Sequence, residues 1–315
     1  MEESIRIGIS ACLLGQQVRY DGGHKLDRFL RDTLGAYVEY VPVCPEAECG
    51  LGVPREAMRL VGDPADPRLV TNKTGIDHTE RMKAYAQKRL DALANEGLSG
   101  FIFKSDSPSS GMERVRVYDA KGVPSKTGSG IFARAFMDRF PLLPVEEEGR
   151  LHDPRLRENF IERIFAHRRW RALAAKPSMG ALVEFHAAHK LQLMAHSPKA
   201  YTELGRLVAA GAPDGLGPTL AAYEALFMKA LAVKATPGKN ANALSHMAGF
   251  FKNELDAEER AELVAVVEAH RNETLPLIVP ITLIGHYVKK YKKEYLLKQT
   301  YLSPHPLELK LRNHC

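Results

Sequence analysis

The sequence predicts an α/β domain with a mainly parallel, Rossmann-like sheet, followed by an all-α domain. Up to about residue 140, short β-branched runs alternate with helical segments, whereas nearly every segment after residue 150 has helical periodicity. The composition also changes at residues 141–150, where a proline-rich stretch is followed by three glutamates and a glycine. The 315 residues are enough for two domains. We place the boundary at residues 148–152, which gives domains of residues 1–149 and 150–315.

The elements of the first domain follow from local patterns. Apolar and β-branched runs predict strands, and amphipathic spacing predicts helices. A hairpin and a glycine turn are expected between residue 115 and the last helix. Strands are predicted at residues 5–12, 37–43 and 100–104, and helices at 25–34, 77–95 and 131–140.

The second domain reads as a helical bundle. Proline and glycine mark the ends of its periodic segments, as at Pro198, Pro213 and Pro237. Helices are predicted at residues 155–173, 178–195, 198–210, 217–234, 239–253, 256–270 and 278–300.

Composition excludes several classes of protein. The acidic first residues resemble no targeting segment, and the longest apolar run, residues 275–285, is too short to span a bilayer. Four cysteines are too few for a disulfide framework. We therefore expect a cytoplasmic protein with no membrane partner; the sequence indicates no protein partner.

The positive charge lies in the second half. The net charge is +6; residues 151–315 contain 23 Lys and Arg against 16 Asp and Glu, and the first 150 residues contain 21 against 22. An excess of positive charge favours an anionic partner.

Reactive side chains follow three of the predicted strands. Cys12 ends the first, Cys44 and Glu46 follow the second, and the serines from Ser107 to Ser110 follow the third. In a parallel sheet these loops meet in the crevice at the carboxyl ends of the strands. Converging thiolates are ligands for zinc or an iron–sulfur cluster. The alternative is that the cysteines are small buried apolar residues.

Several motifs give the chain a family resemblance. C-L-L-G, V-R-Y-D-G-G, C-P-E, G-L-G-V-P-R-E and K-S-x-S-P-S-x-G-M-E-R-V resemble the bacterial thiouracil desulfidase (TudS) family. L-R-E-N-F-I-E-R, F-H-x-x-H-K, L-I-V-P-I-T-L-I-x-H-Y and Y-L-S-P-H-P-x-E-L resemble YbgA-type domains of unknown function. The fusion is similar to the RudS-type family of tRNA 4-thiouridine desulfidases.

The resemblance implies a 4Fe-4S cluster held by three cysteines. Cys12 and Cys44 match two of them, but Ser110 occupies the third position. A hydroxyl is a harder and far less acidic ligand than a thiol, so we expect this chain to bind a cluster weakly or not at all. The serine is compatible with a natural sequence or an engineered substitution. Cys49 is either a replacement ligand or an incidental cysteine in a tight turn.

The resemblance also implies the chemistry. An iron without a protein ligand would bind the soft thiocarbonyl sulfur and polarise its carbon toward water, with no net redox change. We expect Glu46 to transfer protons and Ser107 to orient the pyrimidine or the water. From the pattern alone, Glu46 could be a surface carboxylate and Ser107 a loop cap.

The helical domain is the expected tRNA-binding part. Phosphate contacts supply most sequence-independent affinity for nucleic acid. Tyrosines at 287, 291 and 295 repeat at helical spacing and could be part of the core or a platform on which bases stack. We expect His186, His189 and His196 to be hydrogen-bonded rather than to bind a metal. The basic candidates are Arg168, Arg169, Lys289, Lys290, Lys292 and Lys293.

The sequence thus predicts an iron–sulfur-dependent enzyme that converts 4-thiouridine in tRNA to uridine and releases sulfide. The rival hypotheses are a desulfidase of free thiouracil or thionucleosides, a non-catalytic tRNA-binding module with a decayed site, and a structural zinc protein. The oligomeric state and the tRNA position recognised are outside what the sequence indicates.

Overall fold

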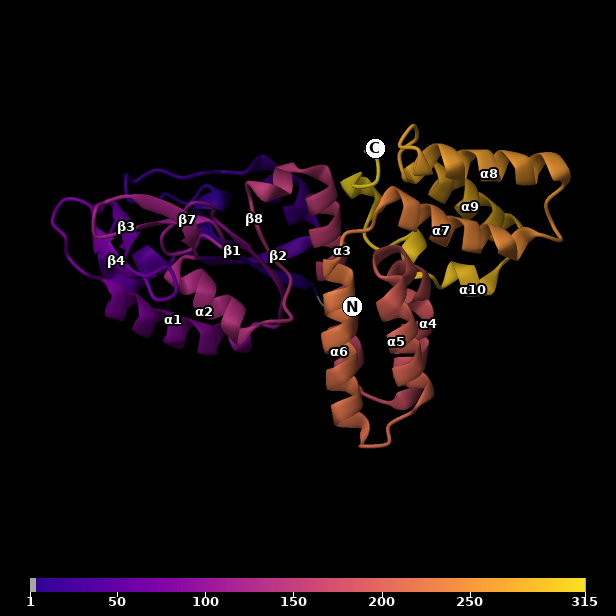
Figure 1. Ribbon diagram of the computed structural model, residues 1–315, viewed down its shortest axis with the longest axis horizontal. Helices are drawn as coiled ribbons and strands as arrows, with labels where there is room; N and C mark the ends of the chain where they lie inside the picture. Colours follow the sequence, from indigo (N-terminus) through magenta and orange to yellow (C-terminus); the bar gives the residue numbers. More distant parts are fainter. Residues whose placement is uncertain (1–3, 315) are drawn as a thin grey trace. The chain divides into compact units, whose positions relative to one another are not determined.

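The computed structural model describes residues 4–314, which form two compact units that divide between His152 and Asp153 (Figure 1). The first unit contains the strands and two helices. The second is almost entirely helical. The predicted fold class is therefore confirmed.

A four-stranded parallel sheet forms the centre of the first unit. Its strands are β1 (Ile5–Ser10), β2 (Val38–Val43), β5 (Leu98–Phe103) and β8 (Val145–Glu147), in the order β2-β1-β5-β8. Every neighbouring pair is parallel. The carboxyl ends of β1, β2 and β5 therefore lie at one edge of the sheet.

Strand β8 was not predicted, because residues 141–150 showed only a change of composition near the domain boundary. Glu146 and Glu147 of this strand are buried. Glu146 accepts a hydrogen bond from Arg150 Nε at 2.6 Å, and Glu147 accepts one from the Met112 amide at 2.7 Å. These partners allow acidic side chains inside the fold.

A second, mixed sheet was only half predicted. It has the order β4-β3-β6-β7. The expected hairpin forms β6 (Val115–Tyr118) and β7 (Pro124–Gly128), whereas β3 (Met58–Val61) and β4 (Arg68–Thr71) were not predicted. Four-residue strands carry too little periodicity to stand out in a sequence.

Helices α1 (Thr79–Ala94) and α2 (Ile131–Arg139) pack against each other and lie on one face of the parallel sheet (Figure 1). Phe136 of α2 contacts Phe101 and Phe103 of β5, with ring centroids 4.6 and 5.5 Å apart. The helix expected at residues 25–34 is only a π-helical turn at Phe29–Thr33 and a 3-10 turn at Leu34–Ala36, so that prediction was wrong in type and length.

The helical unit follows the predicted order. Five of its helices begin at a Ser, Thr or Asp whose side chain accepts a hydrogen bond from the first turn, which fixes their start points. Its helices are α3 (Pro154–Ala174), α4 (Met179–His196), α5 (Pro198–Ala209), α6 (Leu216–Ala232), α7 (Pro237–Ala248), α8 (Ala257–Arg271), α9 (Ile278–Lys290) and α10 (Glu294–Leu297).

The single helix expected at residues 278–300 was wrong. It is broken between α9 and α10, where Lys292 adopts a positive φ of 49°. The Lys293 amide then donates to the carbonyl of Val288 at 3.0 Å and closes the helix end.

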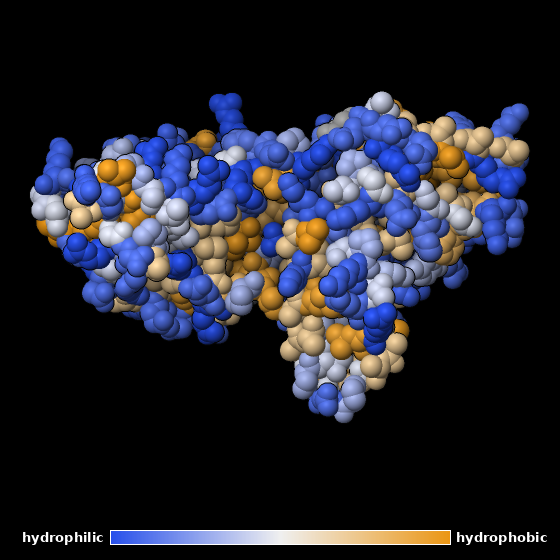
Figure 2. Space-filling model, viewed as in Figure 1, coloured by the Kyte–Doolittle hydropathy of each residue, from blue (hydrophilic) through white to orange (hydrophobic). Residues whose placement is uncertain are grey.

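Figure 2 shows hydrophilic residues over most of the visible surface, with hydrophobic patches that include parts of α5 and α6. Among residues 4–314, no single helix is long and apolar enough to cross a membrane; one pair, Leu216–Ala232 with Pro237–Phe251, passes that test jointly but is bent by 116°.

Aromatic and histidine side chains fill the core between α3, α4 and α6. Trp170 stacks on Tyr223 with ring centroids 5.4 Å apart. Burial lowers the pKa of His167 and His186 to about 4 and that of His189 to about 3. These three rings are therefore neutral at pH 7.

We expect the helical unit to lose stability as the pH falls from 6.5 to 5. The unfolded chain binds protons at these three histidines near pH 6.5, but the folded chain does not until the pH is much lower. The free energy of unfolding therefore decreases as the pH decreases, by up to about 1.4 kcal/mol for each histidine and each pH unit. Urea unfolding followed by the fluorescence of Trp170, the only tryptophan, measures this.

Two features make that test specific. Although burial opposes it, Glu162 raises the pKa of His196, so the folded chain binds at least as many protons at His196 as the unfolded chain does, and this residue does not cause the loss of stability at low pH. The variant His246→Gln removes an exposed histidine of the same unit and should keep the pH dependence. A free energy of unfolding that is constant between pH 6.5 and 5 would contradict the prediction.

Candidate functional site

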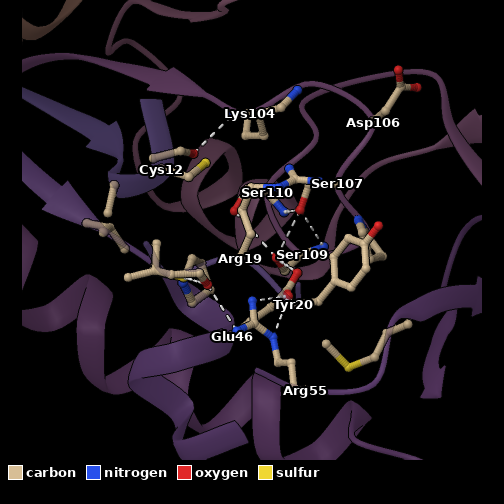
Figure 3. A pocket seen from close by; sticks show the side chains of 18 of the residues that line it. Cys12, Arg19, Tyr20, Glu46, Arg55, Lys104, Asp106, Ser107, Ser109 and Ser110 are labelled. Carbon is tan, nitrogen blue, oxygen red and sulfur yellow. Dashed lines mark hydrogen bonds and ion pairs between the residues drawn. The ribbon is translucent and has the colours of Figure 1, made fainter. Parts of the chain in front are cut away.

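Three strand ends of the parallel sheet open onto one cavity of about 210 Å³ (Figure 3). Cys12 lies in the 3-10 turn after β1, Cys44 directly follows β2, and the serine loop, Ser107 to Ser110, follows β5. All of them line the cavity, as does Glu46. The structure thus brings together residues that are up to 98 positions apart in the sequence.

The two thiols are held in a setting largely shielded from water. Burial raises the pKa of Cys12 to about 11, and the neighbouring Cys44 adds to this, whereas the positive charges of Lys104 and Arg19 oppose it. Burial also raises the pKa of Cys44, whose Sγ lies 3.6 Å from the carbonyl oxygen of Val18. Both side chains are therefore thiols at neutral pH and must lose a proton to ligate a metal.

The third ligand position does not complete a cluster site. Ser110 is buried, with its Oγ 3.5 Å from that of Ser109. Within residues 4–314, no group of three His, Cys, Asp or Glu side chains is placed to hold a metal ion. Cys49 points elsewhere: its Sγ lies 3.3 Å from the Glu46 carbonyl, and the side chain packs against the α/β core. Two thiols and one hydroxyl do not fit a cluster that needs three thiolates.

The Glu46 carboxylate is fixed on both oxygens. Arg55 donates to Oε2 from Nε at 2.9 Å and from Nη2 at 2.6 Å. Ser109 Oγ donates to Oε1 at 2.8 Å. The Arg55 and Glu46 side chains are only 6% and 13% exposed. Glu46 is therefore an oriented carboxylate within the cavity, not a freely moving surface group.

The serine loop connects to Glu46 through a hydroxyl that the sequence analysis missed. Ser107 Oγ lies 3.1 Å from Ser109 Oγ and accepts a hydrogen bond from the Ser110 amide at 3.1 Å. Because Ser109 donates to Glu46, the Ser107 hydroxyl can donate to Ser109. A series of hydrogen bonds therefore runs from Ser107 through Ser109 to Glu46. Neighbouring serines have the same sequence signal, so only the fold distinguishes them.

Helix α2 holds this loop in place. The amides of Phe132 and Ala133, in its first turn, donate to the Ser109 carbonyl at 2.9 and 3.1 Å. Gly130, just before the helix, allows the close approach, because a Cβ there would lie 2.4 Å from the Ser109 carbonyl carbon. The loop is therefore part of the rigid α/β unit.

A second ion pair supports the same strand end. Lys104 Nζ bonds to Glu148 and donates to the Ser105 carbonyl at 2.9 Å, while Glu148 accepts from the Ser105 amide at 2.7 Å. Lys104, Arg19 and Arg55 all line the cavity and were not predicted as site residues. Their only sequence signal was their place within the quoted motifs.

The basic candidates of the helical unit do not form one exposed cluster. Arg169 donates to His189 at 3.1 Å and to the Pro304 carbonyl at 2.9 Å, and Arg168 is half-buried on the same helix. Lys290 and Lys293 pair with Glu259 and Glu254, whereas Lys289 and Lys292 are exposed.

The aromatic and histidine candidates mostly belong to the core. Tyr287 is buried and Tyr291 half-buried, but Tyr295 is 38% exposed and stacks on Phe250 at 5.3 Å. His186 bonds to the Tyr223 hydroxyl, His189 to the Phe185 carbonyl, and His196 to Glu162 and the Val233 carbonyl.

Comparisons with known proteins agree with this division. Residues 7–148 match the 2-thiouracil desulfurase family model, and residues 190–306 match that of a protein family of unknown function, DUF1722. The chain is 31% identical to the uncharacterized protein YbgA of Escherichia coli (strain K12) over 161 residues, which cover 50% of this chain and 95% of YbgA. It is 30% identical to the uncharacterized protein YbbK of Bacillus subtilis (strain 168) over 132 residues, 40% of this chain and 85% of YbbK. A solved structure of the [4Fe-4S]-dependent thiouracil desulfidase TudS is 33% identical and covers 48% of this chain and 95% of its own, with a TM-score of 0.39.

The Glu46–Arg55 pair predicts a strong stability coupling. Arg55→Met leaves a nearly buried carboxylate without its cation, and we expect it to lower the free energy of unfolding of the α/β unit by about 3–5 kcal/mol. Adding Glu46→Gln to Arg55→Met should recover part of this loss, because no charge is then left unpaired. Urea unfolding of the wild type, both single variants and the double variant, followed by far-UV circular dichroism, measures the coupling. Additive effects of the two substitutions would show that the pair is not coupled.

Proposed function

Because the chain belongs to the 2-thiouracil desulfurase family and carries a second domain of the DUF1722 family, we propose that it is a desulfidase of thiolated uracil whose substrate is 4-thiouridine in tRNA. The observation that carries the proposal is the convergence of Cys12, Cys44, Glu46 and the serine loop on one cavity. Replacing the thiocarbonyl sulfur by the oxygen of water releases hydrogen sulfide and transfers no electrons. The reaction therefore needs proton transfer and a site for sulfur.

The residues of the cavity suit these needs. Glu46 takes a proton from the attacking water and returns it to the departing sulfide or the base nitrogen. Arg55 orients the Glu46 carboxylate, and Ser109 and Ser107 extend its hydrogen bonds to the serine loop. Ser107 is then the group that orients the pyrimidine or the water.

This chain differs from the family it resembles in the residues that would bind the cofactor. A 4Fe-4S cluster held by three cysteines would use Cys12, Cys44 and the position of Ser110. Because Ser110 offers a hydroxyl, we propose that this chain keeps the substrate cavity of a desulfidase but is impaired in holding the cluster. We derive no reaction step through the cluster for the chain as it stands.

We propose the helical unit as the tRNA-docking part. Residues 151–315 carry the whole excess of positive charge. Contacts between such cations and phosphates increase the affinity for nucleic acid. Lys289, Lys290 and Lys292 are exposed, and Lys290 and Lys293 share their charge with glutamates. The competing functions are a desulfidase of free thiouracil and a tRNA-binding module without catalysis.

The variant Ser110→Cys tests the proposal. After anaerobic reconstitution, we expect it to gain iron, sulfide and desulfidase activity, because the third thiolate completes the ligand set. Iron and sulfide assays measure the cluster, and mass analysis of nucleosides from thiolated tRNA measures the conversion of 4-thiouridine to uridine. Ser109→Cys is the matched control, since it places a thiol one residue away from the ligand position.

The outcomes separate the alternatives. Full cluster occupancy in the unchanged chain would refute the role given to Ser110. A cluster without activity on any substrate would favour the non-catalytic module. Turnover of free thiouracil but not of thiolated tRNA would favour the free-base enzyme.

Glu46→Gln, made in the Ser110→Cys background, should keep iron and sulfide but lower kcat by at least about 100-fold, the usual effect of losing a general acid–base. The amide keeps the shape of the side chain but does not take a proton. Glu80→Gln is the control, because the Glu80 side chain is 89% exposed and does not line the cavity. An unchanged kcat in Glu46→Gln would remove Glu46 from the proton-transfer role.

A further inference from the structure

The helical unit has a cavity of its own, of about 50 Å³. Its walls come from α3, α7, the ends of α4 and α8, the segments just before α7 and α9, and the C-terminal residues. One water needs about 10–15 Å³ of such space, so the cavity has room for a few waters or for one ion of the size of phosphate. Nine of its twelve lining residues are polar or charged, so a ligand there must pair with polar groups.

Two carboxylates in the wall are fixed in place. Glu158 accepts a hydrogen bond from Arg312 Nε at 3.1 Å and bonds to His314 Nε2 at 3.0 Å. Glu162 bonds to His196 Nε2 at 3.1 Å. Although its burial acts the other way, the charges of His196 and Arg312 lower the pKa of Glu162 to about 2. Each carboxylate oxygen can accept more than one hydrogen bond, so both side chains can also accept one from a ligand.

A histidine in the same wall has a ring nitrogen without a partner. His270 lines the cavity and is 5% exposed. Its Nδ1 lies 3.0 Å from the Leu275 carbonyl oxygen, which can only accept, so Nδ1 carries the proton. In the part of the chain that the structure describes, Nε2 is buried and has no hydrogen-bond partner. A buried acceptor of this kind favours a ligand that donates a hydrogen bond.

The other lining side chains supply positive charge and donors. Arg155 bonds to Glu273 through Nη2, but its side chain is 46% exposed and has further N–H groups. Lys234 is exposed. Asn240 accepts a hydrogen bond from the Tyr301 hydroxyl at 2.9 Å, which leaves its Nδ2 as a donor. Asn240 lies near the start of α7, the end of a helix that carries partial positive charge.

This combination of groups is selective among anions. The cations and the amide favour a negative ligand, whereas the carboxylates and the histidine nitrogen require that the ligand also donates a hydrogen bond. Sulfate and simple carboxylates have no O–H group at neutral pH, and a phosphate monoester loses its last proton near pH 6. Inorganic hydrogen phosphate keeps at least one O–H group and is small enough for the cavity.

We infer that this cavity is a binding site for inorganic hydrogen phosphate. Arg155, Lys234 and Asn240 hold its charged oxygens, and the wall acceptors Glu158, Glu162 and His270 receive its O–H. Bound phosphate connects α3, α7, the end of α8 and the C-terminal residues, so it stabilises the folded helical unit. The inference is independent of the proposed function, because no residue that lines the cavity at the strand ends takes part.

Calorimetric titration of the chain as it is, in a phosphate-free buffer at pH 7.5 and constant ionic strength, tests the site. The probes are sodium phosphate, sodium sulfate and methyl phosphate. We expect phosphate to bind with a Kd below about 1 mM, and both other anions to bind at least about tenfold more weakly, because they lack the hydrogen bond to a charged acceptor.

Variants assign the binding to the cavity. Arg155→Gln should weaken phosphate binding about tenfold, through the loss of one charge-assisted contact. Arg260→Gln is the matched control, since Arg260 is an exposed arginine at the other end of α8 and does not line the cavity, and it should leave the affinity unchanged. Glu158→Gln should reduce the preference for phosphate over sulfate, because the amide can donate to sulfate.

Three outcomes would overturn the inference. The first is a Kd for phosphate above about 10 mM. The second is equal affinity for all three anions, which would leave only a cationic mouth without selective acceptors. The third is an equal loss of affinity in Arg155→Gln and Arg260→Gln. If urea unfolding shows that Glu158→Gln does not fold, the series of anions and the two arginine variants decide the question alone. None of these outcomes bears on the desulfidase proposal.

Discussion

The ion pair between Glu46 and Arg55 organises the cavity. Arg55 bonds to the Glu46 carboxylate with two nitrogens and reaches the carbonyls of Val18 and Gly52 with a third. One guanidinium therefore connects the segment after β2, the loop after β1 and its own loop. Only arginine has enough donors in a fixed plane to do this, and lysine would not replace it. A buried pair of this kind contributes little net stability, but it determines where each segment lies.

The parallel sheet supplied what the sequence could predict of the site. Because β1, β2 and β5 run in the same direction, the residues after them had to meet at one edge, and Cys12, Cys44, Glu46 and the serine loop do so. The bonds that make the cavity specific were not predictable in this way. Arg55 lies in a loop between a helical turn and a short strand, and its contacts with Glu46 and Val18 depend on the packing of segments that no local periodicity relates. The same holds for β8, whose glutamates are buried only because Arg150 and the Met112 amide are there to bond them.

Ser110 changes the chemistry of one side chain and leaves the hydrogen bonds of the serine loop in place. The position of the third ligand is well ordered, since the loop is bonded to α2 and Gly130 leaves room for it. A thiol at position 110 would differ from the present side chain by one atom. Glu46 and Ser107 to Ser109, which we propose face the substrate, do not depend on that atom for their mutual hydrogen bonds. The hydrogen bonds of the cavity that we propose for the substrate therefore do not require a cysteine at position 110.

The charge of the helical unit shows why composition alone does not locate a nucleic-acid surface. Its net charge of +7 includes Arg312, which is buried and paired with Glu158, and Arg169, which bonds to His189 and the Pro304 carbonyl. Lys290 and Lys293 are engaged by glutamates of neighbouring segments. Cations that are paired in this way stabilise the fold but attract phosphate only weakly, because a neighbouring carboxylate cancels much of their field. The field that a tRNA would meet comes from cations without such partners, so the sites of attraction follow from the pairing of each charge rather than from the number of lysines and arginines in a segment.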